Sequence, residues 1–384
     1  MVARLLKNQG YEVDTAGGGQ EALMRMAETA YPLVVTDWMM PDIDGIELAR
    51  RIRASEGLSY TYVVMLTSRG DDQADVNHAL GAGVDDLLAK PVEREDLIAR
   101  LRVAERIIAL QRQLLQQNAE LTTANQRMRR DLSAAAQVQR SLLPHAAPKA
   151  RGWNAAWRSE ACDELGGDTL NIFQLDEHHL AGFVLDVSGH GVGSSLLAVQ
   201  ASRLLQPVMG LGSMLKAPSR EPPFYQLVPA KDLMRNLARK FPPNWDAPQF
   251  FTIVYVTIDT RSGRMVFASG GHCSPLIAAP ARGARAIDLP SSAIGMLPVE
   301  DCEFVDATVT LEPGERVLVY SDGVTETQGD GEEVYGQERL LAIWGRNADR
   351  SLDQALDAIL ADLAAFRGRR PVVDDVTLLA WERS

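Results

Sequence analysis

The hydrophobic positions of residues 11–102 alternate between short apolar runs and amphipathic stretches. The short runs predict strands, and the amphipathic stretches predict helices. The predicted strands cover residues 11–13, 33–36, 62–66 and 87–88, and the predicted helices cover residues 20–27, 45–52, 72–81 and 94–102. This alternation is typical of a doubly wound α/β domain with a parallel sheet. Functional residues of such sheets lie where strands end, and Asp37, Thr67 and Lys90 each directly follow one of these runs.

A long run of helix-forming residues follows, from about Glu93 to Leu143, without a glycine. It predicts a single long helix that stops at Pro144. Apolar positions recur along it with a seven-residue period, as in a coiled coil. The expected seam consists of Leu114, Leu121, Met128, Ala135 and Leu142, with Asn118, Asn125, Leu132 and Gln139 as companion positions. Two core asparagines favour a parallel homodimer. The alternative is an amphipathic helix packed on its own domain.

Beyond residue 151 the pattern changes to strands separated by longer connections. The predicted strands cover residues 180–187, 251–259, 264–268, 303–311, 316–320 and 376–381, and the predicted helices cover residues 195–207, 230–241, 338–344 and 352–366. This mixture predicts an α+β domain in which helices cover sheets. We therefore expect three parts, with bounds 1–102, 103–143 and 144–384. Residues 207–229 form a long connection that is either a flap over a site or a disordered segment.

Four acidic clusters in this last part stand beside predicted strands or turns. They are Gly166-Gly167-Asp168, Asp186-Val187-Ser188-Gly189-His190-Gly191, Ser321-Asp322-Gly323 and Asp374-Asp375-Val376-Thr377. A single Asp-Gly or Gly-Asp pair is most often a turn. Segments that are far apart in sequence converge where strands end, so we expect these carboxylates to meet. Together they predict one binuclear site for hard divalent cations, which suits phosphate chemistry.

Composition and charge limit the possible partners. The chain has 384 residues, 46% hydrophobic and 23% charged, which is enough for two ordinary domains and a connection. Its formal net charge of -12 disfavours nonspecific binding to nucleic acid or to anionic membranes. No apolar run reaches the ~18 residues of a spanning helix, and residues 1–10 lack a signal-peptide pattern. Three cysteines without metal-ligand spacing favour a reducing compartment, so we expect a cytoplasmic protein.

Three stretches of the first part carry a family resemblance. They are Thr36-Asp37-Trp38-Met39-Met40-Pro41-Asp42-Ile43-Asp44-Gly45, Leu66-Thr67-Ser68 and Lys90-Pro91. In this order they resemble a two-component receiver domain. The resemblance implies that Asp37 accepts a phosphoryl group from a sensor histidine kinase, that Thr67 senses it and that Lys90 pairs with it. A strand-end carboxylate is a competent nucleophile, and a nearby ammonium group offsets the added charge.

Two features depart from the receiver pattern. Residues 2–8 already indicate a helix, so the first strand of the sheet is missing, together with the paired acids that hold magnesium in this family. We favour a start upstream of Met1 over a decayed domain, because the rest of the pattern is consistent. A receiver Mg²⁺ is expected only if those acids exist. Leu87 stands where the family usually has an aromatic switch residue, so we expect no coupling by an aromatic flip.

The second resemblance is carried by five motifs in order. The four acidic clusters and Ala268-Ser269-Gly270-Gly271-His272 resemble bacterial metal-dependent serine/threonine phosphatases of the SpoIIE type, in the PPM or PP2C class, over about residues 135–384. The resemblance implies an α-β-β-α sandwich. It also implies that Asp186 bridges two Mn²⁺ or Mg²⁺ ions with the Val187 carbonyl as a further ligand, and that Asp168, Asp322 and Asp374 complete the two metal spheres. A bridging water then attacks phosphorus, and no protein nucleophile is needed.

Four further residues belong to these motifs or flank them. His190 either donates a proton to the leaving alkoxide or is a loop residue bonded to backbone. Asp375 is expected to support Asp374. Asn171 stands where relatives have a second acid, which weakens the expected affinity for the second ion. His272 is expected to be structural.

These inferences combine into one functional hypothesis. We expect a response-regulator phosphatase that acts on phosphoserine or phosphothreonine of a small STAS-type anti-sigma-factor antagonist, under control of Asp37 phosphorylation through the helix. The alternative from another class is a phosphorylation-dependent binding adaptor with a weak or inactive phosphatase fold. A second alternative keeps the enzyme and makes the receiver a constitutive dimerisation module. Retention of all four metal-ligand aspartates favours the enzyme.

Overall fold

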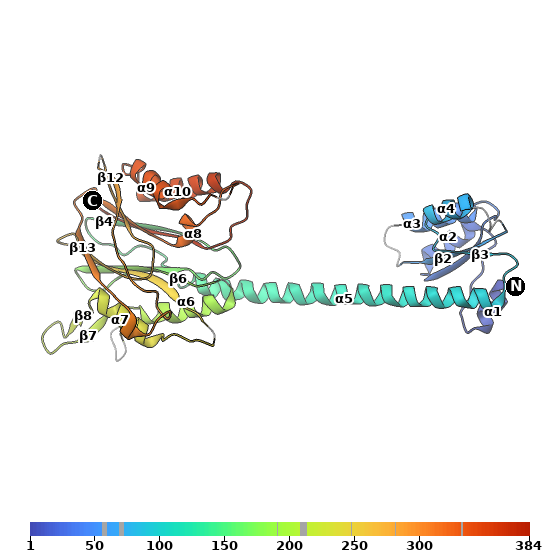
Figure 1. The fold of residues 1–384 in the computed structure, drawn as a ribbon, viewed down its shortest axis with the longest axis horizontal. Helices are drawn as coiled ribbons and strands as arrows, with labels where there is room; N and C mark the ends of the chain where they lie inside the picture. Colours follow the sequence, from blue (N-terminus) through green and yellow to red (C-terminus); the bar gives the residue numbers. More distant parts are fainter. Residues whose placement is uncertain are drawn as a thin grey trace. The chain divides into compact units, whose positions relative to one another are not determined.

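The chain forms two compact units in the computed structural model (Figure 1), Met1–Arg127 and Met128–Ser384, which are described separately. The structure describes residues 1–55, 60–68, 73–189, 191–207, 213–246, 248–280, 282–331 and 333–384. Helix α5, Arg94–Arg140, begins in the first unit and ends in the second. Within these described ranges, no helix combines the length and the apolarity needed to cross a bilayer.

The first unit is built on a parallel sheet in the order β1-β2-β3. Its strands are β1 Leu33–Asp37, β2 Tyr62–Thr67 and β3 Asp86–Ala89, and its helices are α1 Val2–Asn8, α2 Gly19–Glu28, α3 Gly45–Ala54, α4 Gln73–Gly81 and the start of α5. Helices α2, α3 and α4 contribute to the core on one face of β2, and α1 and α5 contribute to the core on its other face. Strand β2 is therefore buried along its whole length. The predicted doubly wound α/β domain is confirmed.

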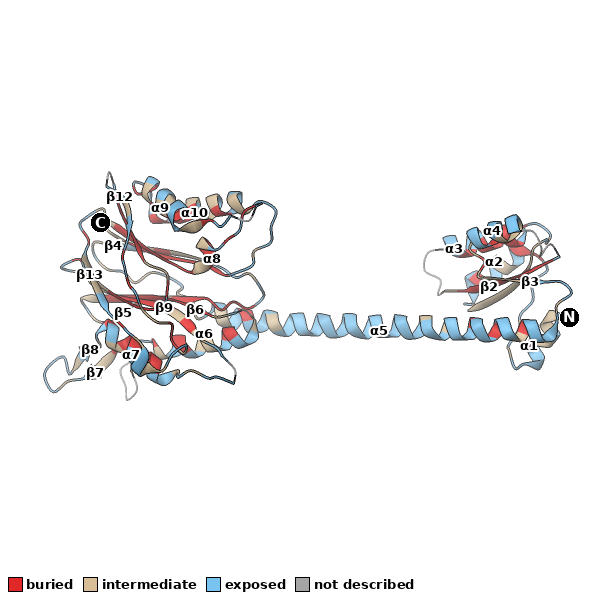
Figure 2. Ribbon diagram, viewed as in Figure 1, coloured by how far each residue is buried: buried red, intermediate tan, exposed pale blue. Residues whose placement is uncertain are grey.

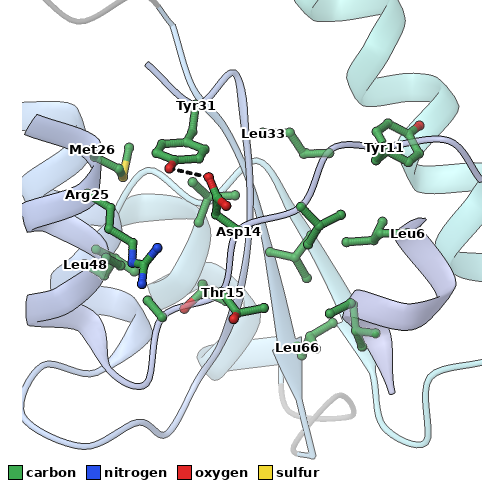
Figure 3. A pocket seen from close by; sticks show the side chains of 18 of the residues that line it. Leu6, Tyr11, Asp14, Thr15, Arg25, Met26, Tyr31, Leu33, Leu48 and Leu66 are labelled. Carbon is green, nitrogen blue, oxygen red and sulfur yellow. Dashed lines mark hydrogen bonds between the residues drawn. The ribbon is translucent and has the colours of Figure 1, made fainter. Parts of the chain in front are cut away.

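The strand predicted at residues 11–13 is wrong, because these residues join no sheet. A cavity of about 350 Å³ separates residues 11–16 from β1 (Figure 3), with Leu6, Leu33 and Leu66 among its lining side chains. Tyr31 donates a hydrogen bond of 2.7 Å to Asp14 across one end of this region. A single extended segment cannot form a ladder without a neighbouring strand. The pattern of residues 11–13 suits a strand, but β1 lies too far away to pair with them.

The second unit consists of two five-stranded sheets packed face to face. One has the order β13-β10-β9-β6-β5 and the other the order β12-β11-β14-β15-β4. The first contains β5 Thr169–Gln174, β6 His179–Val187, β9 Phe251–Asp259, β10 Arg264–Gly270 and β13 Asp306–Thr310. The second contains β4 Trp153–Glu160, β11 Leu276–Ala279, β12 Gly283–Ala286, β14 Arg316–Tyr320 and β15 Val376–Arg383. An apolar core that includes Val184, Val254 and Trp381 fills the space between them.

Helices cover the outer face of each sheet (Figure 1). Helices α6 Val192–Leu204 and α7 Ala230–Lys240 pack on the first sheet, and α9 Gly336–Arg346 and α10 Leu352–Arg367 pack on the second. Figure 2 shows the buried residues concentrated in the sheets and on the inner sides of these helices. The expected α-β-β-α sandwich is confirmed.

Several elements of this unit were not predicted. The omitted strands are β4, β5, β11 and β12, and the omitted short helices are α8 Asp322–Thr325 and η1 Val299–Asp301. The connection at residues 207–229, which was left open between a flap and a disordered segment, contains two strands that were not predicted, because β7 Lys216–Pro218 pairs with β8 Tyr225–Leu227. Leu215, just before β7, is buried in the core beneath α7. Residues 208–212 lie outside the described part.

The long helix confirms the predicted run of helix formers. Its expected seam residues Leu114, Leu121 and Met128 are 54%, 60% and 57% exposed. In the last turns of α5, the helix face that packs against the second unit differs from the predicted seam. Ala136 is buried there, whereas the seam residue Ala135 is exposed. The end of the helix therefore packs on its own unit, which was the alternative to pairing along the full length.

Candidate active site

The four predicted carboxylates come from the ends of neighbouring strands. In the first sheet, Asp168 directly precedes β5 and Asp186 lies near the end of the adjacent β6. In the facing sheet, Asp322 begins α8 directly after β14, and Asp374 lies two residues before β15. Strands β5 and β6 are neighbours, and so are β14 and β15, so all four side chains gather at one end of the sandwich.

The electrostatics of these carboxylates indicate mutual repulsion. Burial, together with the Asp322 and Asp374 carboxylates, raises the pKa of Asp186 to about 7. Burial and the Asp186 carboxylate hold the pKa of Asp168 well above its usual value. Burial also raises the pKa of Asp374, with a contribution from Asp322. Carboxylates that disfavour one another's ionisation in this way are stabilised by a shared cation.

Two glycines let the loops approach closely. A Cβ atom at Gly323 would lie 2.1 Å from the Asp375 carbonyl oxygen, so only glycine fits beside Asp322. A Cβ atom at Gly167 would lie 2.8 Å from the Val187 carbonyl oxygen. The Val187 carbonyl, one of the predicted ligands, therefore lies beside the loop that carries Asp168.

Asp375 connects the loops from behind the site. Its carboxylate accepts hydrogen bonds from the backbone N–H groups of Cys162, at 2.8 Å, and Asp168, at 3.1 Å. Its own N–H donates to Asp374 at 2.8 Å. Asp375 is 4% exposed, so these bonds form out of contact with solvent. Asp375 was expected to support Asp374, and its carboxylate also fixes the position of Asp168.

The donor set fits hard divalent cations. Asp168 Oδ2 is buried and has no hydrogen-bond partner. The surrounding candidate metal ligands are carboxylate and carbonyl oxygens, the ligand type that Mg²⁺ and Mn²⁺ prefer. Within the described residues, no three His, Cys, Asp or Glu side chains already stand in a metal-ligand arrangement.

The remaining predicted residues of this unit have different surroundings. His190 lies outside the described residues. Asn171 lies in β5, where its side-chain oxygen accepts from the N–H of the next residue at 2.8 Å. His272 is buried, its Nδ1 lies 2.6 Å from Thr252 Oγ1, and burial lowers its pKa to about 4. Thr252 stands opposite Asp186 on β9. No motif pointed to Thr252, because threonine is common in strands.

The receiver residues also lie together at strand ends. Lys90 Nζ donates to Asp37 Oδ2, and the Lys90 backbone N–H donates to the Thr67 carbonyl at 2.8 Å. Asp37 ends β1 and Thr67 ends the adjacent β2. Parallel strands bring their carboxyl ends to one edge of the sheet, so the three predicted residues share that edge.

Comparison with known proteins gives matches to both parts. The family model of stage II sporulation protein E (SpoIIE) matches residues 176–384, and the response regulator receiver domain model matches residues 1–102. The phosphoserine phosphatase RsbP of Bacillus subtilis (strain 168) is 30% identical over 167 residues, which are 43% of this chain and 38% of RsbP. The phosphate regulon transcriptional regulatory protein PhoB of Rhizobium meliloti (strain 1021) is 39% identical over 97 residues, 25% of this chain and 42% of PhoB.

A solved structure is similar in fold. The SiaA-PP2C domain of Pseudomonas aeruginosa superimposes with a TM-score of 0.54 at 21% identity, covering 68% of this chain and 99% of that domain. The chain spans about two fifths of the length of the curated relatives it matches. The SpoIIE match alone covers more than half of the chain. The chain therefore belongs to the stage II sporulation protein E (SpoIIE) family and carries a response regulator receiver domain in its N-terminal part.

Proposed function

We propose that this chain is a response-regulator phosphatase that hydrolyses phosphoserine or phosphothreonine on a protein substrate. The observation that carries the proposal is the convergence of Asp168, Asp186, Asp322 and Asp374 at one end of a PP2C-type sandwich, with the pKa values of three of them raised by burial and by one another. A binding adaptor has no need for buried carboxylates that repel one another.

Each residue has a defined part in the proposed chemistry. Asp186 would hold two Mn²⁺ or Mg²⁺ ions, with the Val187 carbonyl as a further ligand, and the other three aspartates would complete their coordination. When bound, such ions neutralise charge on the phosphoryl oxygens and lower the pKa of the attacking water. Asp375 keeps Asp168 in place through its backbone N–H. His190 would donate a proton to the leaving alkoxide, and Asn171, an amide where relatives have a second acid, would lower the affinity for the second ion.

The decisive experiment measures phosphate release by the full chain. The substrates are a generic aryl phosphate and a phosphoserine-containing anti-sigma-factor antagonist, each with Mn²⁺ and with a chelator. We expect turnover that requires the metal. A folded protein that binds the phosphorylated antagonist and releases no phosphate from either substrate with Mn²⁺ present would favour the adaptor instead.

The proposed substrate class is a phosphorylated STAS-type antagonist within a partner-switching circuit. It is supported by the similarity to RsbP, whose name describes a phosphoserine phosphatase. The proposed partner of the receiver is a sensor histidine kinase. The proposed domain bounds remain 1–102, 103–143 and 144–384.

Asp37 is the proposed phosphoacceptor of the receiver. Incubation with a small-molecule phosphoryl donor should label the wild-type chain with an acid-stable, base-labile phosphate, because Lys90 offsets the added charge. Asp37→Asn should remove the label, whereas Asp42→Asn, an exposed neighbour, should retain it. Labelling of Asp37→Asn at the wild-type level would place the phosphoacceptor elsewhere.

Gln139 is the proposed contact through which the helix influences the site. Its Nε2 donates a hydrogen bond of 2.8 Å to the carbonyl of Gly166, two residues before Asp168. Gln139→Ala should lower turnover about fivefold, because a net hydrogen bond of about 1 kcal/mol no longer holds that loop. The control is Gln137→Ala, at an exposed position on the same helix. Equal turnover of the two variants would contradict the role.

The exposed seam of α5 supports a parallel homodimer. Leu114 and Leu121 would pack against the same residues of a second copy, and burying each would remove apolar side chains from water. Sedimentation of the full chain as a monomer at micromolar concentration would contradict this pairing.

A further inference from the structure

The second unit, Met128–Ser384, contains a cavity with a cationic lining. It measures about 410 Å³ and lies between the β5–β6 turn, the β9–β10 turn and residues 149–151. It is at the opposite end of β6 from Asp186, because His179 begins that strand and lines the cavity. His179 and Asp186 are seven residue steps apart along β6, a distance of roughly 23 Å. The cavity is therefore not part of the aspartate site.

The charges around this cavity are unbalanced. Lys149, Arg151 and Arg261 line it with three positive charges, and Glu177 contributes one negative charge. None of the three cations forms an ion pair with another described residue of the chain. This local excess stands out in a protein whose formal net charge is -12. Two further lining residues, His178 and His179, offer imidazole nitrogens.

The nearby acids are engaged elsewhere. Asp176 accepts from His179 Nδ1 at 2.8 Å and from the backbone of its own turn. Asp259 accepts from Ser262 Oγ at 2.8 Å and from the backbone N–H of Arg261. Because these carboxylates are held within their turns, they do not neutralise the lining arginines directly.

The frame of the cavity is cross-linked by hydrogen bonds. Both the N–H and the Oγ1 of Thr260 donate to the His178 carbonyl at 2.9 Å, which joins the two turns. Trp153 Nε1 donates a hydrogen bond of 3.2 Å to the Thr260 carbonyl. The Trp153 backbone forms an isolated antiparallel β-bridge with Ala150. All three segments are thus held together without a ligand, so little ordering is needed on binding.

We propose that this cavity binds a small dianion, a phosphate monoester or inorganic phosphate. The net formal excess of two positive charges matches the charge of a phosphate group near neutral pH. Arginine forks are suited to phosphate oxygens, and two arginines face the cavity from different segments. Its volume lies within the range of small-molecule sites. A bound anion would connect residues 149–151, which follow α5, to the start of β6.

The test uses the full chain carrying Asp186→Asn, in chelator, so that neither metal nor turnover contributes. Inorganic phosphate and glycerol 2-phosphate are titrated by calorimetry and by thermal shift, with glycerol as the neutral control. We expect saturable binding and a rise in the melting temperature of the second unit. Binding of both probes assigns a monoester site, and binding of inorganic phosphate alone assigns a free-phosphate site.

Variants connect the binding to the cavity. The double substitution Arg151→Ala with Arg261→Ala should weaken binding about tenfold or more, because two charge-assisted contacts are lost. Arg151→Lys should retain part of the affinity, since the charge remains. The control is Arg285→Ala, an exposed arginine of β12. Unsaturable binding, or equal binding by the double variant and the control, would overturn the proposal, whatever the outcome for phosphatase activity.

Discussion

Asp186→Asn is expected to reduce metal-dependent phosphate release by about a thousandfold, while the protein stays folded. Asp186 is the carboxylate that the other acids surround, and its pKa is raised to about 7 by burial and then by Asp322 and Asp374. An amide of the same shape binds a hard cation less strongly than a carboxylate does. The variant would therefore hold less tightly the cation that neutralises the charge on the phosphoryl group. The measurement is the initial rate of phosphate release at saturating Mn²⁺.

The same substitution should stabilise the metal-free protein. An aspartate whose folded pKa exceeds its unfolded pKa binds a proton more tightly when folded, so the chain loses stability as pH rises from about 4 to about 7. Asp186→Asn removes this loss and should raise the melting temperature at pH 8 in chelator by about 2–4 °C.

Asp349→Asn, at an exposed position, serves as the control for both measurements of Asp186→Asn and should change neither. Retained turnover in Asp186→Asn would remove this residue from the site. A lower melting temperature in chelator would show that the carboxylates do not repel.

The outline of the fold could be predicted because its central elements have strong patterns. Strands β6, β9, β14 and β15 are nearly continuous apolar runs, and the glycine-free helix could be recognised from its composition. Strand β4 was missed because only two of its eight positions are buried. Residues 11–13 were wrongly assigned because a strand depends on a neighbour that its own sequence does not specify.

The approach of the four aspartates to one another could be expected from the sequence, whereas the hydrogen bonds around them could not. Asp168 and Asp322 stand beside glycines, and all four aspartates lie near the ends of predicted strands or turns, a pattern that a single sequence reveals. The hydrogen bond from Gln139 to Gly166 depends on how α5 is rotated about its axis. A seven-residue repeat gives the spacing of helix positions but not which side packs on the chain's own unit. The contact of Thr252 with His272 likewise depends on the register of β9.

Asp375→Asn is expected to lower turnover and metal affinity 10- to 100-fold, the range found when a residue behind a metal ligand is changed. The Asp375 carboxylate accepts from two backbone N–H groups, those of Cys162 and Asp168. An asparagine has one acceptor oxygen, so in either orientation its NH₂ group faces one of these donors. The buried N–H then lacks an acceptor, at a cost of about 1–3 kcal/mol.

The distinguishing observation for Asp375 is recovery at high metal concentration. If the residue acts by fixing Asp168, excess Mn²⁺ should restore part of the activity of Asp375→Asn, because the four aspartates proposed as metal ligands are still present. Excess Mn²⁺ should restore much less activity to Asp186→Asn, which lacks one of the proposed ligands. The control is Asp288→Asn, at an exposed position of the same unit. Wild-type Mn²⁺ dependence in Asp375→Asn would contradict the role, because Asp168 would then keep its place although one of the two hydrogen bonds to residue 375 is lost.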